Sequence, residues 1–492
     1  MSLPMTLLTV CLVYLAVVAV IGAVAYRRTG SSSEEYFLGG RTARTVVVFM
    51  ALLGTNVTPF VIMGIPGLAY HHGVGVFGLN AAIVALGIPW TFYMIGWPAW
   101  KAARRVGALT PAELFAERLA SPGLGVVLFI AFVVYTLPYL VTSVLGVGIA
   151  VSVLTRDAVS FELAAALILV VTIAYTATGG MKATMWTNVF QGSVFLGLMV
   201  VAFFGVAEGL GGFSAATEAV RQAAPELLTK GDRPPFAPGA WASWGLAISL
   251  TVIAFPHMLV RIFAARDVAA LKNTCRLYPP ILVLLWLPAV MFGVWGAAAI
   301  PGLEGRASDQ IFPLLVQAHL EPVLQGVALA GVLAAVMSTI DAQFLTLGSM
   351  LSRDVVRRLA PDIEDRHEVA WGRAFVLLLA VATYGVVLWR PASIFDIATF
   401  SFSGYVMLVP TMMGALHWRR TTAVGAIASI VAGNAVLLLT MARDQPLGGL
   451  LPVAWGLAAA IVALVAGSLL SRPPRRAVID RAMGPVEPSG AP

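Results

Sequence analysis

Apolar segments of about 20 residues recur from one end of the chain to the other, and they limit the possible folds more than any other feature. Each is long enough to cross the roughly 30 Å hydrocarbon core of a bilayer as a helix. Charged residues make up 11% of the 492-residue chain and its mean hydropathy is +0.89, a composition that soluble globular proteins do not have. The sequence therefore predicts an all-α, polytopic membrane protein.

We expect thirteen membrane-spanning helices. They lie near residues 4–26, 45–70, 75–99, 124–153, 160–178, 188–210, 241–265, 274–300, 324–351, 371–389, 393–417, 421–441 and 448–471. The first segment lacks the basic start of a cleaved signal peptide, so we expect it to be retained. Together they form a single predicted transmembrane domain, residues 1–471.

Basic residues predict how these helices are oriented. Seven of the 31 Lys and Arg residues fall in segments on the predicted outer side: Arg156, Arg221, Lys230, Arg233, Arg306, Arg390 and Arg443. The positive-inside rule then places the N-terminus outside and the C-terminus in the cytoplasm, in the cell's inner (plasma) membrane. Because the net charge of +7 is spread over short loops, it predicts no nucleic-acid partner.

Three polar segments lie outside the predicted spans. We expect residues 211–240 to form an outer loop with little regular structure, and residues 352–373 to extend a helix into the cytoplasm before a turn near Pro361. The tail, residues 472–492, has the composition of a disordered segment.

Residues Leu329–Arg358 begin as an apolar run but carry polar side chains where a spanning helix meets hydrocarbon. On a helix, Ala335, Ser338 and Thr339 share one face, which offers a carbonyl and two hydroxyls to a small hard cation. The alternative is that both hydroxyls bond to carbonyls of their own helix. Asp341 would cost roughly 2.5–3.5 kcal/mol in hydrocarbon, so it should face the bundle interior or a wet path.

The predicted second span, residues 45–70, is interrupted near its middle. Gly54, Asn56, Thr58 and Pro59 cluster in the segment GTNVTPF. Because Pro59 has no N–H and its ring crowds the preceding turn, we expect the helix to kink or unwind there. Unwinding would free backbone carbonyls for an ion, whereas a simple proline kink would not.

Broken helices at the middle of the membrane are how secondary transporters build sites for ions and solutes. Freed carbonyls attract a cation, and the positive ends of half-helices attract anionic solutes. The interrupted span and the polar face of the central helix together indicate a secondary transporter.

Several segments resemble the sodium:solute symporter family, which includes bacterial proline, pantothenate, monocarboxylate and sugar symporters. They occur in family order as EEYFLGGRT at 34–42, VIMGIPG at 61–67, TGGMKATMWTNVFQG at 178–192, FPHMLVRIFAARD at 255–267, and AAVMSTIDAQ at 334–343. The resemblance implies a LeuT-like fold of two inverted five-helix repeats, about residues 45–210 and 241–417, with one helix before them and two after. It also implies sodium-driven import of a small organic solute by alternating access, with Na⁺ as the coupling ion and no enzymatic activity.

The family's sodium site, carried over residue by residue, implies five oxygen ligands. They are the backbone carbonyls of Gly54, Val57 and Ala335 and the hydroxyls of Ser338 and Thr339. Asp341 lies within a turn of this site, where it could steer the ion or bond to a neighbouring helix.

We expect the solute to bind beside the break, where three spans meet. The candidate contacts are Thr55, Asn56, Thr58 and Phe60 of the second span, Tyr135 and Tyr139 of the fourth, and Thr251 and Phe255 of the seventh. For the two tyrosines, packing around Pro138 is an equal alternative.

The resemblance also bears on the solute. Proline symporters carry aromatic residues at the positions of Ile248 and Val252, and segment 135–149 is more similar to the monocarboxylate and haloacid branch. A monocarboxylate is therefore the predicted solute, with proline, pantothenate or a sugar as alternatives.

Two positions depart from the family pattern. Proline symporters have Asp at the position of Asn56, and many relatives have Asp at the position of Asn188. The second carboxylate is tied in some relatives to a second sodium or to ion exit, so its absence predicts one sodium per transport cycle.

A sensor and an integral-membrane enzyme are the alternative classes. A sensor on the same fold would carry a signalling domain, and none follows Arg472; an integral-membrane enzyme would need His, Asp or Glu clustered near one interface. Proton coupling through Asp341 is a variant of the transporter hypothesis. The predicted partners are the solute and the lipid bilayer, without an obligate protein partner.

Overall fold

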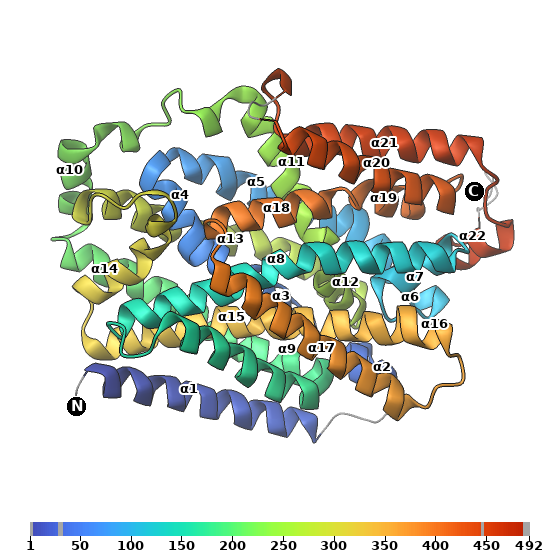
Figure 1. The fold of residues 1–492 in the computed structure, drawn as a ribbon, viewed down its shortest axis with the longest axis horizontal. Helices are drawn as coiled ribbons and strands as arrows, with labels where there is room; N and C mark the ends of the chain where they lie inside the picture. Colours follow the sequence, from blue (N-terminus) through green and yellow to red (C-terminus); the bar gives the residue numbers. More distant parts are fainter. Residues whose placement is uncertain (1–2, 28–32, 444–446, 486–492) are drawn as a thin grey trace.

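The computed structural model is a bundle whose helices run along the long axis of the molecule (Figure 1). The structure describes residues 3–27, 33–443 and 447–485. These residues form helices and connecting segments and no β-strand, which confirms the all-α prediction. α1 (Leu3–Tyr26) begins at one end of the bundle and α22 (Arg476–Met483) lies at the other.

Each of the thirteen predicted spans overlaps a helix of the structure. In chain order these are α1; α3 (Thr45–Asn56) with η2 (Phe60–Gly64) and α4 (Ile65–His72); α5 (Gly75–Thr91) with η3 (Phe92–Gly96) and α6 (Trp97–Val106); α8 (Pro122–Leu154); α9 (Phe161–Gly209), which holds two; α11 (Pro238–Ala254) with α12 (Pro256–Phe263); α13 (Val268–Ala299); α15 (Pro322–Met350); α17 (Asp365–Trp389); α18 (Ile394–Val406) with α19 (Val409–His417); α20 (Ala423–Met441); and α21 (Pro452–Leu470).

Within the described part of the chain, fewer than thirteen helices qualify as membrane spans when length and apolar composition are both required. Among the described residues, ten helices are long and apolar enough to cross a membrane, or up to twelve if each of two bent pairs forms one span. α9 is divided at Gly180, whose φ of +59° interrupts the helical path. Its first part, Phe161–Ala174, is apolar but shorter than the others, so the count of thirteen stays a prediction.

The break expected at Pro59 is present. Val57 has an extended backbone (φ −89°, ψ 104°), and the chain from Phe60 to His72 continues at 54° to α3. Gly146 of α8 makes room for this turn, because a Cβ at Gly146 would lie 2.4 Å from the Cβ of Pro59. The helix is therefore broken and not merely kinked.

A second break, which the sequence analysis did not predict, divides α11 from α12. Phe255 is extended between them (φ −65°, ψ 125°), and the two helices meet at 51°. Pro256 begins α12 and cannot donate a backbone hydrogen bond to α11, and this was the available signal. The broken helices begin the two predicted repeats, about 45–210 and 241–417, whose boundaries remain a prediction.

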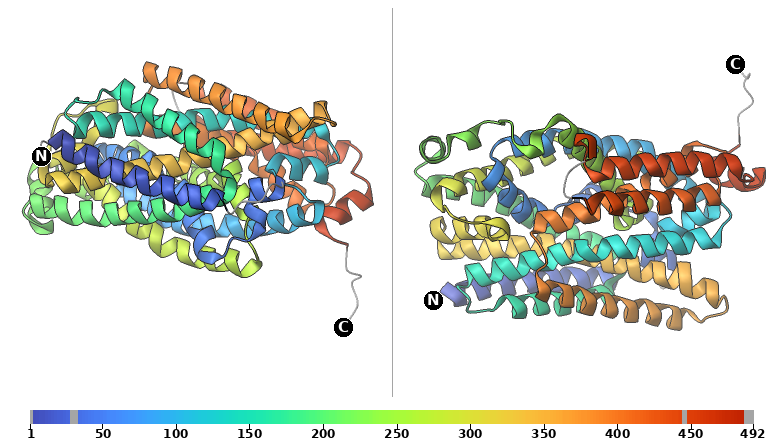
Figure 2. Two further views of the ribbon diagram at one scale, coloured as in Figure 1. Left: turned by 90° about the horizontal axis from the view of Figure 1, so that it is seen from below. Right: turned by 45° about the horizontal axis from the view of Figure 1, so that its top comes forward.

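α15 is the most enclosed of the long helices, and every residue from Ala328 to Met350 is buried. It packs against α1, α3, α8, α9, α12 and α17, and α1 covers its outer side in both Figure 1 and Figure 2. Beyond Met350 the helix continues as η7 (Leu351–Val356) and α16 (Arg357–Leu359) before it turns, as expected near Pro361.

Two segments expected to lack regular structure contain helices. In the 211–240 loop, α10 (Phe213–Ala223) packs on α13, where the rings of Phe213 and Trp295 lie 5.6 Å apart. Short helices gain most of their stability from packing of an apolar face, which composition alone does not reveal. The expectation is therefore wrong for α10.

The same correction applies to the tail. α22 buries Ile479 and Ala482 against α6 and α7 (Pro111–Arg118), and Arg419 forms an ion pair with Asp480. Disorder was therefore wrongly predicted for residues 476–483, while residues 486–492 lie outside the described part of the chain.

Candidate functional site

The break after α3 lies against the polar face of α15. The hydroxyl oxygen of Ser338 is 2.7 Å from the Gly54 carbonyl oxygen and 3.0 Å from the Ala335 carbonyl oxygen. The Thr339 hydroxyl donates to the Ala335 carbonyl at 2.9 Å. We call these four buried residues the oxygen cluster. It contains four of the five predicted sodium ligands.

The hydrogen bonds of the cluster match only in part the alternative in which both hydroxyls bond to carbonyls of their own helix. Thr339 bonds to its own helix at i−4, but Ser338 also bonds to Gly54, 284 residues away on another helix. Each hydroxyl oxygen keeps lone pairs for a cation, whereas the Ala335 carbonyl oxygen becomes available once the two hydroxyl hydrogens turn away from it. Oxygens of these types suit sodium. Val57, the fifth predicted ligand, is extended and buried, but among the described residues no hydrogen bond ties its carbonyl to the cluster.

A small cavity lies beside the same turn. Its lining consists of Asn56, Val57, Phe60, Val61, Tyr139, Ile248, Val252, Phe255, Leu282, Leu285, Trp286 and Phe402. Its volume of about 20 Å³ leaves room for about one water molecule. Most of the lining is apolar or aromatic, and Asn56 supplies the only side-chain amide. A larger solute therefore requires these side chains to move apart.

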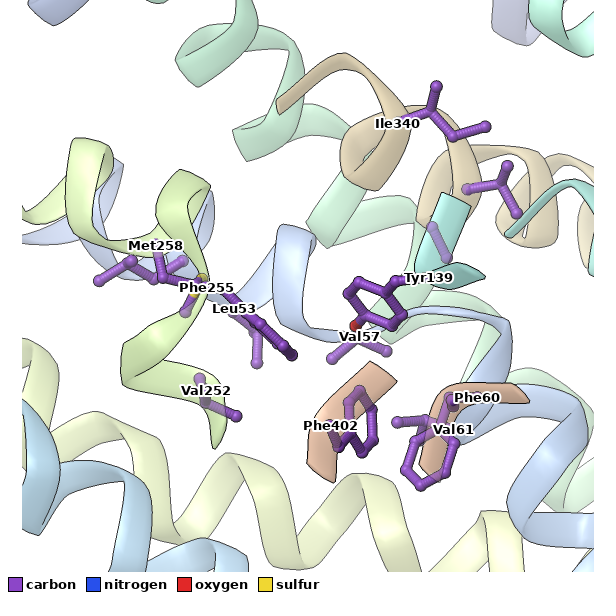
Figure 3. Close-up of a cluster of buried hydrophobic side chains, with 14 of the residues drawn as sticks. Leu53, Val57, Phe60, Val61, Tyr139, Val252, Phe255, Met258, Ile340 and Phe402 are labelled. Atoms are coloured by element: carbon purple, nitrogen blue, oxygen red, sulfur yellow. The ribbon is translucent and has the colours of Figure 1, made fainter. Parts of the chain in front are cut away.

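Aromatic rings form much of the wall of this cavity, and Figure 3 shows how they lie relative to one another. Phe402 of α18 lies 5.0 Å from the ring of Phe60 and 5.5 Å from that of Tyr139. Tyr139 is stacked on Phe255 at 5.0 Å. Three of the predicted solute contacts therefore meet around Phe402, which the sequence analysis did not identify.

The other predicted solute contacts lie behind the lining. Thr55 donates to the Ala51 carbonyl (2.8 Å), Thr251 donates to the Phe402 carbonyl (3.0 Å), and Thr58 accepts a hydrogen bond from the Tyr139 hydroxyl (3.5 Å). The Thr55 hydroxyl therefore bonds within its own helix, whereas those of Thr58 and Thr251 join different helices.

Tyr135 does not line the cavity. Its ring fills the space beside Gly404 of α18, and its hydroxyl bonds to Asn434 of α20. The structure places Tyr135 among packing contacts, which was the stated alternative. Tyr139, one turn further along α8, does reach the cavity.

Several lining residues came from segments that the sequence analysis did not connect with the site. Leu282, Leu285 and Trp286 belong to α13, and their apolar pattern resembles that of any buried helix. Ile248 and Val252, which were compared with the aromatic positions of proline symporters, do face the cavity.

His257 belongs to the family-like segment at 255–267, and it lies next to the cavity wall. Its ring is 1% exposed and is stacked on Phe255 (5.2 Å between ring centres) and Tyr139 (6.4 Å). Within the described residues neither ring nitrogen has a hydrogen-bond partner.

Asp341 faces the bundle interior, as expected. It is fully buried, and its Oδ1 lies 3.8 Å from Nη2 of Arg261 on α12. The sequence left open whether Asp341 steers the ion or contacts a neighbouring helix, and the structure shows the contact. Arg261 is 80 residues away in the chain, so no local pattern links the two.

Comparisons with known proteins find relatives along most of the chain. A family model described as the sodium:solute symporter family matches residues 36–433. The sodium/pantothenate symporter of Escherichia coli (strain K12) is 28% identical over 472 residues, which cover 92% of this chain and 94% of that protein. The sodium/proline symporter of Salmonella typhimurium (strain LT2) is 26% identical over 457 residues, 89% of this chain and 88% of that protein.

Solved structures share the fold. A Na⁺-coupled sialic acid symporter in a substrate-bound outward-open state matches with a TM-score of 0.79 and 18% identity, over 95% of this chain and 98% of that one. A nucleobase-cation-symport-1 family transporter in a closed conformation matches with a TM-score of 0.58 and 14% identity, over 89% and 95% of the two chains. The predicted LeuT-like fold is confirmed.

Proposed function

Because the chain belongs to the sodium:solute symporter family, we propose that it imports a small organic acid together with sodium by alternating access. Sodium is the coupling ion. One observation carries the proposal for this chain: a single turn serves both sites. Gly54 belongs to the oxygen cluster and accepts a hydrogen bond from Ser338 of α15, while Asn56 and Val57 line the aromatic cavity.

The shared turn supplies the coupling. In our account the ion is held by the carbonyls of Gly54, Val57 and Ala335 and the hydroxyls of Ser338 and Thr339. An ion bound there holds the end of α3 against α15 and fixes the turn that the solute contacts. Coupling of this kind is reciprocal, so the solute also raises the affinity for sodium.

The cavity favours a solute with one polar group and an apolar body. Phe60, Tyr139, Phe255 and Phe402 surround the apolar part, and Asn56 offers an amide to the polar part. The start of α12 lies at the break beside Phe255, and the positive end of a helix attracts a carboxylate. A monocarboxylate satisfies these conditions.

The relatives are named for two of the alternative solutes. Those described above are named for pantothenate and proline, and each of these solutes carries one carboxylate. A sugar would need partners for several hydroxyls, which a lining with one amide does not provide.

We further propose that the N-terminus faces outward and the C-terminus faces the cytoplasm across the plasma membrane. α1 begins at the end of the bundle that holds α10, and α22 lies at the opposite end (Figure 1). The same orientation leaves seven of the 31 Lys and Arg residues in outer segments.

The experiment is uptake into proteoliposomes of labelled pyruvate, acetate, pantothenate, proline and glucose, with and without an inward sodium gradient. We expect sodium-dependent uptake of one or more of the acids and none of glucose. A matched run with a pH gradient and no sodium tests proton coupling.

Two outcomes would contradict the proposal. Uptake that a pH gradient drives equally well without sodium would favour proton coupling, and uptake of no solute under any gradient would favour a sensor. Sodium-dependent uptake of proline alone would agree with a symporter but would contradict the prediction, based on Ile248 and Val252, that proline is not the solute.

A further inference from the structure

Two opposite charges lie inside the bundle beside the oxygen cluster. Arg261 of α12 is 1% exposed, Asp341 of α15 is fully buried, and Arg261 Nη2 lies 3.8 Å from Asp341 Oδ1. At membrane depth an ionised side chain is expensive unless an opposite charge or hydrogen-bonding groups compensate it. The two residues therefore have to be considered as one nearly neutral unit.

The pair is close to the oxygen cluster on both sides. Asp341 follows Thr339 by two residues on α15. Arg261 reaches the cluster through Asn188 of α9, whose backbone oxygen would be 3.4 Å from a Cβ placed on Gly54. In the amide orientation that satisfies both of its ends, the Asn188 side chain accepts a hydrogen bond from Arg261 Nη2 at 2.7 Å. One residue thus separates the guanidinium from Gly54.

Neutral groups fix the far side of this arrangement. In the same orientation the Asn188 amide nitrogen donates to the Thr184 carbonyl (3.0 Å) and to Gln191 Oε1 (2.9 Å). Gln191 in turn donates to the Tyr14 hydroxyl of α1 at 3.1 Å. Because these partners carry no charge, they orient the guanidinium without changing the net charge near the cluster.

The oxygen cluster itself supplies no formal negative charge, because its members are carbonyls and hydroxyls. Charges near it therefore have a large influence on a bound cation. A guanidinium alone would repel sodium, and a carboxylate alone would attract it. With both present the two effects oppose each other.

We propose that Arg261 and Asp341 are positioning residues that set the sodium affinity of the oxygen cluster through their balanced charges. The proposal rests on the sodium site proposed above. It goes further in assigning opposite effects to two residues that contact each other and that supply none of the five proposed ligands. If the ion pair were purely structural, both single substitutions would weaken sodium binding.

The test is thermal unfolding of the purified full chain over a series of sodium concentrations at pH 8, with choline chloride holding the ionic strength constant. A ligand that binds the folded state raises its melting temperature as its concentration passes the Kd, so no solute is needed. We expect Asp341→Asn to raise the half-stabilising sodium concentration about tenfold or more, and Arg261→Gln to lower it about threefold or more.

Two further variants guard against a general loss of structure. The double variant Arg261→Gln with Asp341→Asn contains no uncompensated charge, so it should fold and bind sodium within about threefold of the native protein. Glu368→Gln is the matched control. It removes one carboxylate from the Arg357–Glu368 ion pair (2.8 Å), which involves no residue of the oxygen cluster, and should leave the sodium response unchanged.

The outcomes separate the two proposals. If sodium stabilises the native protein no more than choline does, the sodium site is wrong and the charge-balance proposal falls with it. If sodium stabilises the native protein but both single variants weaken binding, the site stands and charge balance is overturned. If the single variants do not fold, the double variant decides. Tenfold weaker sodium binding in the double variant would also overturn the charge-balance proposal.

Discussion

Glycine and proline residues decide where the backbone of this protein opens. Pro59 ends the hydrogen-bond pattern of α3, and Gly146 allows α8 to approach the resulting turn. The turn then presents the Gly54 carbonyl to Ser338. A methyl group added at Gly146 would push against Pro59 and so displace the turn that carries the Gly54 carbonyl of the proposed sodium site.

We predict that Gly146→Ala lowers the melting temperature and raises the sodium concentration needed for half-maximal uptake. The new Cβ would lie 2.4 Å from the Cβ of Pro59, and overpacking of this kind typically costs about 1–3 kcal/mol. Gly385→Ala is the control, because nothing lies within 4 Å of a Cβ there. If Gly146→Ala and Gly385→Ala have the same melting temperature and the same sodium dependence of uptake, the Pro59 turn tolerates displacement.

Asn56 tests the charge of the solute. It is the only side-chain amide in the cavity lining, so Asn56→Asp would place a negative charge there. We predict at least a tenfold higher KM for a monocarboxylate and a lower KM for the zwitterion proline, measured by uptake. Asn56→Ser, which is neutral, should affect the two solutes alike. A lower KM for the monocarboxylate in Asn56→Asp would contradict an anionic solute.

At the scale of elements, the two bent pairs are tied to neighbours that the chain order does not reveal. Asp309 of η6 (Gly305–Gln310) accepts a hydrogen bond from the first N–H of α18 (Ile394, 2.8 Å) and packs against Gly67 of α4. Burial raises the pKa of Asp309 to about 7. This carboxyl joins the helix after the first break to α18, which carries Phe402.

The raised pKa predicts how stability depends on pH. Between about pH 4 and pH 7 the folded state keeps a proton on Asp309 that the unfolded state has released, so this contribution to stability falls as pH rises through that window. We predict a lower melting temperature at pH 8 than at pH 5, and a smaller difference in Asp309→Asn. Asp157→Asn, at an exposed loop position, should keep the native difference. If Asp309→Asn keeps the native difference in melting temperature between pH 5 and pH 8, groups other than Asp309 cause that difference.

The sequence predicted those elements whose cause is local. The apolar runs, the break at Pro59 and the shared face of Ala335, Ser338 and Thr339 follow from composition, ring chemistry and helical spacing. α10 and α22 were missed because tertiary packing of short apolar faces stabilises them. The second break has a local signal in Pro256, the first residue of α12.

The site itself was predictable only in part for the same reason. Asn56 and Tyr139 were found from the break and from the resemblance, but Phe402 and Trp286 reach the cavity through helix packing. The contact between Arg261 and Asp341 joins two helices 80 residues apart, so no spacing rule could provide it.

At the scale of the whole molecule, α15 lies at the centre and the first broken helix meets it at the oxygen cluster. Because the same turn lines the aromatic cavity, we propose that an ion bound at the centre of the bundle controls the surface that a solute meets. The central claim is therefore that sodium binds where α3 and α15 touch.

The most direct test is equilibrium binding of ²²Na⁺ to the purified protein, comparing the native chain with Ser338→Ala combined with Thr339→Ala. Thr383→Ala is the control, because this buried threonine of α17 makes the same kind of i−4 bond, to the Leu379 carbonyl at 2.7 Å. We predict saturable binding of one sodium ion per chain in the native protein and the control, and at least a tenfold loss of affinity in the double variant. Native affinity in the double variant would contradict the account.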